Sequence, residues 1–158
     1  MKILVLRFSA MGDVAILSVV MKALLDQNPN AEIWMLSRPH FKPLFSFGSE
    51  RLHYVEADLQ HKYAGTTGMY KLFNDINQKG PFDFIFDMHD VMRTWGLSTL
   101  FTLRNAKIFR INKGRADKRK LVAKSKKQFK QLPTTLERYA KVCRDAGFNL
   151  DLNRLKLG

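Results

Sequence analysis

Short apolar runs alternate with segments of helical spacing along the sequence, and this alternation restricts the fold more than any other feature. The runs cover residues 3–6 (ILVL), 31–36 (AEIWML), 52–55 (LHYV), 82–88 (FDFIFDM) and 106–111 (AKIFRI). The run at 3–6 is continuous, which is typical of a strand buried on both faces of a parallel sheet. Strands that alternate with helices pair in parallel through right-handed crossovers. The sequence therefore predicts an α/β fold with a doubly wound, mostly parallel sheet, within the size of one domain.

Apolar residues recur at the spacing of one helix face between these runs. After Asp13 they are Leu17, Val20, Met21, Leu24 and Leu25, and later in the chain they are Met69, Leu72, Phe73 and Ile76. A short helix is expected over 40–47 and a longer one over 91–103. In the longer helix, Trp95 and Leu100 are expected to be packing residues.

The last predicted helix has signals at both ends. Thr134 with Glu137 fits a capping box, in which the hydroxyl and the carboxylate each accept a bond from a free N–H. Gly147 is placed for a stop in the left-handed conformation, with Phe148 packing back onto the last turn. One face carries Leu136, Tyr139, Ala140 and the only cysteine, Cys143, which is expected to be a packing residue.

The turn Gly12-Asp13 follows the first predicted strand, at the edge where open α/β sheets bind ligands. Gly12 has no Cβ, so a ligand can approach its backbone closely. Asp13 begins the next helix, where free N–H groups favour a carboxylate. It is either a helix N-cap or a general base that accepts a proton from a hydroxyl, and the two roles are compatible. The stretch SAMGDV fits neither the dinucleotide-binding nor the P-loop pattern.

The charge of the chain is concentrated in one segment. The formal net charge is +13, and residues 113–130 (KGRADKRKLVAKSKKQFK) hold nine basic residues and one acid. This run is either a solvated face or a contact for acceptor phosphates and an anionic membrane surface. No stretch approaches the roughly 18 continuous apolar residues that a membrane span needs. With one cysteine, no intrachain disulfide can form, which suits a cytoplasmic location.

Four stretches of the sequence resemble motifs of one known family. The stretch FSAMGDVAILSVVMKAL is similar to the amino-terminal motif of family 9 glycosyltransferases, the bacterial heptosyltransferases of lipopolysaccharide core synthesis. The similarity continues at FDFIFDMHDVMRT, at INKGRADKRK and at TTLERYAKVCRDAGF, and it spans roughly residues 1–148. One departure is Thr134, where many relatives have His, so no role beyond capping is expected for it.

The resemblance implies a Rossmann-like half of a two-domain GT-B enzyme. Residues 1–148 would be the amino-terminal acceptor-binding domain and 149–158 the start of the interdomain linker, with the donor-binding domain absent. The implied reaction is an inverting transfer without metal or cofactor. A heptose-like sugar would move from a nucleotide-sugar donor, ADP-heptose, to an anionic lipid A-Kdo acceptor. The chain alone would be inactive, and the protein would be cytoplasmic and peripheral to the inner membrane.

The resemblance implies that Asp13 is the catalytic base. Residues expected to bind substrate are Ser9, Met11, Gly12, His89, Asp90, Arg93, Lys113, Arg115, Lys118, Arg119 and Lys120. His89 and Asp90 are either acceptor contacts or turn residues, and Arg93 either pairs with an anionic group or is solvated. Arg38, His40, His61 and Lys62 are weaker acceptor candidates. No metal site is expected, because His89 with its acidic neighbours Asp87 and Asp90 fits no zinc spacing.

Two other functions remain as alternatives. A basic α/β module that binds nucleic acid or an anionic surface would use the run at 113–130. The sequence has no helix-turn-helix, RRM or zinc-finger signature, so we expect no nucleic-acid partner. An unrelated nucleotide-binding α/β domain would bind ADP or ATP by this chain alone.

Overall fold

A single parallel sheet organises the chain in a computed structural model that describes residues 1–112 and 131–155. The five strands lie in the order β3-β2-β1-β4-β5. They are β1 (Lys2–Leu6), β2 (Glu32–Ser37), β3 (Leu52–Glu56), β4 (Phe84–Asp87) and β5 (Lys107–Arg110). All four pairings are parallel, so the predicted α/β, doubly wound fold is confirmed.

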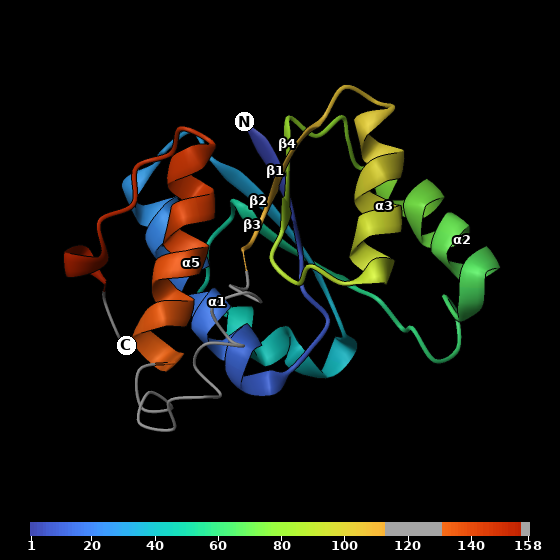
Figure 1. The fold of residues 1–158 in the computed structure, drawn as a ribbon, viewed down its shortest axis with the longest axis horizontal. Coiled ribbons are helices and arrows are strands. Elements are labelled where there is room, and N and C mark those ends of the chain that lie inside the picture. The colour runs from blue at the N-terminus through green and yellow to red at the C-terminus, as the bar shows by residue number, and fades with distance from the viewer. Residues whose placement is uncertain (113–130, 156–158) are drawn as a thin grey trace, which may run out of the picture.

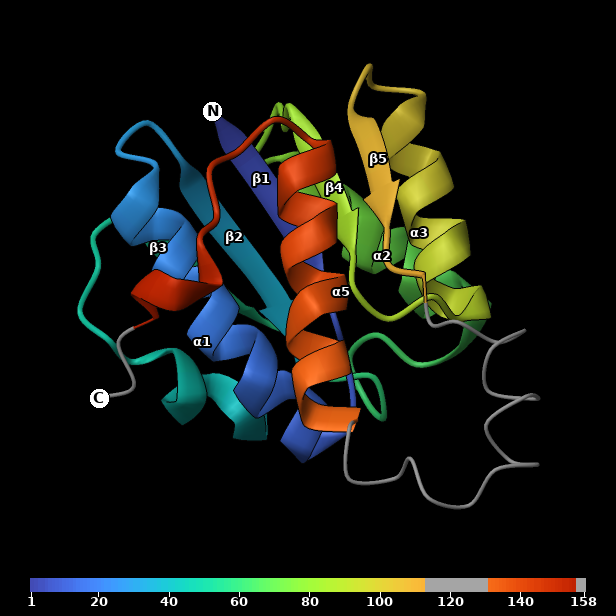
Figure 2. The same cartoon turned by 60° about the vertical axis from the view of Figure 1, so that its left-hand side comes forward.

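Helices cover both faces of the sheet (Figures 1 and 2). The α-helices are α1 (Met11–Gln27), α2 (Gly65–Asn77), α3 (Met92–Thr102) and α5 (Gln131–Asp145), and the 3₁₀ helices are η1 (Pro39–Phe45) and η3 (Leu152–Arg154). Helices α1 and α5 pack together on one face, and α2 and α3 pack together on the other. No helix of the described residues is long and apolar enough to cross a membrane.

Side chains of the central strand alternate between two hydrophobic cores. Ile3 and Val5 point into the core beneath α1 and α5, whereas Leu4 and Leu6 point into the core beneath α2 and α3. All four are fully buried. This explains the unbroken apolar run at 3–6, because a strand covered on both faces has no solvent side.

The strand order reverses between β1 and β4. The chain builds β1, β2 and β3 outward in one direction and then crosses over to build β4 and β5 in the other. Leu6 and Asp87, the last residues of β1 and β4, are paired in register. In sheets of this kind the ligand crevice forms at such a switch point, beyond the carboxyl ends of the strands.

The predicted elements match the observed ones with small shifts at their ends. Strand β4 is shorter than the predicted run 82–88, and the predicted helix at 40–47 is the 3₁₀ helix η1. Helix α5 begins at Gln131, so Thr134 lies within the helix and the predicted N-cap position is wrong. The other end is confirmed: Gly147 has φ +96°, and the Phe148 N–H donates to the Cys143 carbonyl at 3.0 Å.

Residues 149–155 lie along the carboxyl end of α1. The Asn28 side chain donates to the Asn149 carbonyl at 2.7 Å and accepts from its N–H at 2.9 Å. Gln27 makes the same pair of bonds to Asp151, at 3.1 and 2.7 Å. Two side-chain amides therefore fix the direction of the chain after α5, in the segment predicted to start a linker.

Candidate functional site at the strand switch point

Two turns meet at the carboxyl edge of the sheet, one after β1 and one after β4. The starts of α1 and α3 lie at this edge, one on each side of the sheet (Figure 1). The Arg7 Nη1 donates to the Met88 carbonyl at 2.7 Å, and the Phe8 N–H donates to His89 Nδ1 at 3.3 Å. These bonds bring together residues 81 positions apart in the chain. The turns 7–13 and 88–93 therefore form one corner.

Asp13 presents a carboxylate at this corner. Its Oδ2 accepts from Arg7 Nη2 at 2.9 Å, while its side chain is 43% exposed and that of Arg7 only 9%. Among the described residues, no hydrogen bond reaches the second oxygen, Oδ1. The carboxylate is thus fixed on one side by a buried guanidinium and open to solvent on the other. This is the geometry required of a group that accepts a proton from a bound hydroxyl.

The helix cap at this turn differs from the sequence-based interpretation. The N-cap of α1 is Ala10, which has no side-chain cap, and the Val14 N–H donates to the Ala10 carbonyl at 2.9 Å. Asp13 is therefore three residues past the cap, in the first turn. The interpretation of Asp13 as the N-cap is wrong, although a first-turn carboxylate still lies at the positive end of the helix dipole.

Gly12 and its neighbours leave the approach to Asp13 open. No atom lies within 4 Å of the place where a Cβ at residue 12 would stand, apart from the local chain and helix backbone. Gly12 is exposed, and Met11 is 62% exposed. Packing against the protein therefore does not require a glycine at position 12, which agrees with its predicted role in letting a ligand come close.

His89 lies against the turn that follows β1. Because the Phe8 N–H donates to Nδ1, that nitrogen carries no proton, and the neutral ring holds its proton on Nε2. Nε2 lies 3.4 Å from the Ser9 hydroxyl. Ser9 and His89, both predicted to contact substrate, are thus brought together beside Asp13.

Asp87 organises the second turn, a role that the sequence interpretation missed. It is fully buried, and its Oδ1 accepts from the N–H groups of His89 and Asp90 at 3.0 and 2.9 Å. Its Oδ2 accepts from Arg110 Nε at 2.8 Å and from the Thr94 hydroxyl at 3.0 Å. Because both of its carboxylate oxygens accept hydrogen bonds from the protein, Asp87 positions the turn and is inaccessible to substrate.

The position of Trp95 corrects a prediction. We expected packing, but the side chain is 37% exposed, because the inward face of α3 is formed by Thr94, Leu97, Ser98 and Phe101. Its indole N–H donates to Asp90 Oδ1 at 2.7 Å. Asp90 has φ +55°, a left-handed conformation that Asp tolerates better than most residues. Arg93 is exposed in the first turn of α3, which fits both a solvated arginine and one that meets an anionic ligand.

Tyr139 ties α5 to the Asp13 turn and was not predicted as a site residue. Its hydroxyl donates to the Asp13 carbonyl oxygen at 3.1 Å, and the residue is fully buried. Burial raises the pKa of the Tyr139 hydroxyl to about 12. The hydroxyl is therefore protonated at neutral pH and remains a hydrogen-bond donor.

The remaining predicted residues lie elsewhere. Lys113, Arg115, Lys118, Arg119 and Lys120 fall outside the described residues. His40 and His61 are exposed, and His61 lies 3.2 Å from Asp58. The Arg38 carbonyl accepts a bond from Tyr54. Among the described residues, no group of three His, Cys, Asp or Glu side chains is placed to hold a metal ion.

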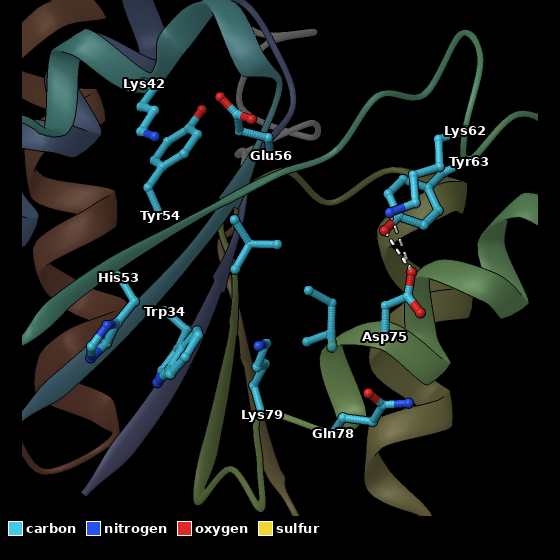
Figure 3. Close-up of a pocket in the computed structure, with 12 residues that line it drawn as sticks. Trp34, Lys42, His53, Tyr54, Glu56, Lys62, Tyr63, Asp75, Gln78 and Lys79 are labelled. Atoms are coloured by element: carbon cyan, nitrogen blue, oxygen red, sulfur yellow. Dashed lines mark hydrogen bonds and ion pairs between the residues drawn. The ribbon is translucent and has the colours of Figure 1, made fainter.

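Lys62 lines a separate open groove of about 670 Å³ along β3 (Figure 3). Trp34 and His53 stack on its sheet side with ring centroids 4.3 Å apart. On the opposite wall, the Tyr63 hydroxyl donates to Asp75 at 2.7 Å, and Lys62 lies 3.9 Å from the same carboxylate. None of the residues at the Asp13 corner lines this groove, so the two features are distinct.

The chain is similar in fold to solved structures of glycosyltransferases. The chain matches a family 9 glycosyl transferase from Veillonella parvula with a TM-score of 0.58 and 18% identity, over 72% of this chain and 37% of that one. It matches the E. coli heptosyltransferase WaaC with ADP at 0.61 and 13%, over 99% and 50%. The complex of WaaC with ADP-2-deoxy-2-fluoro heptose gives 0.62 and 14%, over 96% and 50%.

The fold is one found in family 9 glycosyltransferases. The resemblance stated from the sequence motifs is therefore confirmed at the level of fold. The chain spans between 37% and 50% of the length of these structures. No family model matches the chain, and no curated protein sequence matches it.

Proposed function

We propose that this chain is the acceptor-binding, amino-terminal half of an inverting, metal-independent glycosyltransferase. The enzyme would move a heptose-like sugar from a nucleotide-sugar to the inner core of lipopolysaccharide. The observation that carries the proposal is the Asp13 carboxylate, held by the buried Arg7 and half open to solvent at the strand switch point.

Asp13 acts as the general base in this proposal. Its Oδ1 accepts the proton of an acceptor hydroxyl as that oxygen attacks the anomeric carbon of the donor. The bond from the anomeric carbon to the leaving diphosphate breaks on the opposite face, so the configuration inverts. Arg7 keeps the carboxylate oriented, because it also donates to the Met88 carbonyl and is itself buried.

The acceptor is proposed to lie across the corner between the two turns. The His89 Nε2–H and the Ser9 hydroxyl are placed to bond sugar hydroxyls, and Gly12 with Met11 leaves room for the ring. Asp90, Arg93 and the basic residues from Lys113 to Lys120 are proposed as further contacts. The cations suit an anionic lipid A-Kdo acceptor and would bring the protein to the cytoplasmic face of the inner membrane.

The donor is proposed to be ADP-heptose, bound mainly by a second half that corresponds to the part of WaaC outside the match. Support comes from WaaC, whose structures hold ADP and an ADP-heptose analogue and of which this chain covers half. The 158 residues alone would accordingly lack transferase activity.

The test is Asp13→Asn in a protein that contains both halves. Loss of the base should lower kcat by about 10²- to 10⁴-fold with the fold retained by circular dichroism. Asp26→Asn is the matched control, because Asp26 is an exposed acid near the other end of α1. Turnover of the Asp13→Asn variant within about threefold of the parent would reject the assignment.

A further inference from the structure

We infer that Trp95 is a sugar-stacking platform for the acceptor, held in place by Asp90, and this inference rests on the proposed function. The first observation is the exposure of a large aromatic side chain beside the Asp13 corner. Trp95 is 37% exposed and Met92, one helical turn earlier on the same side of α3, is 80% exposed. The helix therefore begins with an apolar surface that its own core does not cover.

The second observation is that the ring is fixed. The Trp95 indole N–H donates to Asp90 Oδ1 at 2.7 Å, and the Asp90 N–H donates to the buried Asp87 at 2.9 Å. Asp90 keeps the uncommon φ of +55° that this arrangement requires. An aromatic ring anchored at its polar edge presents its apolar face without losing further conformational freedom on binding.

The third observation is the position of this ring relative to the hydroxyl-binding groups. Trp95 and Asp90 belong to the turn and first helical turn that follow His89, whose ring faces Ser9. A pyranose has an apolar face of C–H groups and a rim of hydroxyls. An aromatic face beside hydrogen-bonding side chains matches both parts, and binding sites combine these features for such ligands.

Intrinsic fluorescence provides a direct test, because the chain has two tryptophans. Trp34→Phe leaves Trp95 as the only indole, and Trp95→Phe leaves only Trp34, which lies in the separate groove. Titration of the 158-residue chain with a deacylated lipid A-Kdo saccharide should shift the Trp95 emission saturably. The Trp34 emission should stay constant.

Steady-state kinetics of the protein with both halves provides the second readout. Trp95→Ala should raise the acceptor KM by about 3- to 10-fold with a much smaller change in kcat. Asp90→Gly, which keeps the left-handed backbone but removes the indole's partner, should change KM in the same direction. Trp34→Phe is the control and should leave KM unchanged.

The outcomes separate this inference from the proposed function. If calorimetry detects saccharide binding but Trp95 emission and the Trp95→Ala KM do not change, the platform is rejected and the acceptor-binding function stands. If calorimetry detects no binding, the acceptor-binding function fails and the platform with it. Equal responses of Trp34 and Trp95 also reject the platform.

Discussion

Arg7 is the residue on which the geometry of the Asp13 corner depends. It lies at the end of the central strand, is 7% exposed, and bonds both the Met88 carbonyl and the Asp13 carboxylate. A buried cation is stable only with such partners, because burial removes its hydration. Arg7 is therefore a positioning residue for the proposed base.

Arg7→Met should destabilise the fold by about 1–3 kcal/mol, because the buried Met88 carbonyl loses its donor. Urea denaturation measures the change. Arg93→Met is the matched control, since Arg93 is exposed and should change stability by less than about 0.5 kcal/mol. Equal stabilities of the two variants would contradict the role of Arg7.

The sequence predicts which residues lie at the corner better than it predicts their partners. Asp13, Ser9 and His89 follow strands, and parallel strands end at one edge, so their proximity was predictable. The role of Arg7 was not, because a charged residue after an apolar run normally indicates solvent. Trp95 was wrongly predicted to be a packing residue, because two polar residues, Thr94 and Ser98, occupy part of the inward face of α3.

At the scale of single elements, α2 depends on a close backbone approach. A Cβ at Gly68 would lie 2.2 Å from the Tyr63 carbonyl carbon, although Gly68 lies inside the helix. The turn that leads from β3 therefore packs directly on the first turn of α2, and this contact helps to shape one wall of the groove in Figure 3.

Gly68→Ala should cost more than 1 kcal/mol in unfolding free energy and lower the melting temperature, because backbone atoms must move. The same change at Gly12 is the control, since nothing lies within 4 Å of its Cβ position. Gly12→Ala should be neutral or stabilising by up to about 1 kcal/mol, as alanine favours the helix. Differential scanning calorimetry measures both melting temperatures. Similar values for the two variants would contradict the packing argument.

The ends of the helices were predicted from the sequence with unequal success. Glycine in the left-handed conformation marked the end of α5 correctly, because few other residues adopt that backbone. The N-caps predicted at Asp13 and Thr134 both lie inside the observed helices α1 and α5, which begin at Met11 and Gln131. Helix α1 has Ala10 as its N-cap, which offers no capping side chain, so a capping signal in the sequence could not mark this end.

At the scale of the whole molecule, a buried tyrosine hydroxyl and a buried cysteine thiol predict a loss of stability at alkaline pH. Burial raises the pKa of the Tyr139 hydroxyl from 10.0 to about 12 and that of the Cys143 thiol from 9.0 to about 12. The unfolded chain releases these protons at lower pH than the folded protein. The contribution of these two groups to stability should therefore be constant below about pH 9 and be lost as the pH rises toward 12.

Urea denaturation between pH 8 and pH 11.5 measures this fall, at up to about 1.4 kcal/mol per pH unit for each buried group. Tyr139→Phe removes one of the groups that cause this fall, to which Tyr54, whose pKa burial also raises to about 12, contributes as well. The fall should become shallower, and the lost bond to Asp13 should lower stability at neutral pH by about 1 kcal/mol. An unchanged slope would show that Tyr139 does not titrate as its burial requires.

The overall architecture was predictable in class but not in strand order. Alternating strands and helices require a parallel sheet with helices on both faces, and that prediction is confirmed. Alternation does not reveal that β4 returns to the side of β1. Helix α2 lies on the face of the sheet opposite α1, and a right-handed crossover on that face carries the chain back past β1 to β4.

The bond between Tyr139 and the Asp13 carbonyl joins positions 126 residues apart. Through this bond, α5 holds in position the turn that carries the Asp13 carboxylate. Inactivating substitutions should accordingly be found on the side of α5 that carries Tyr139 as well as around Asp13. A survey that sorted variants only by their distance from Asp13 along the chain would wrongly class the α5 variants as remote from the site.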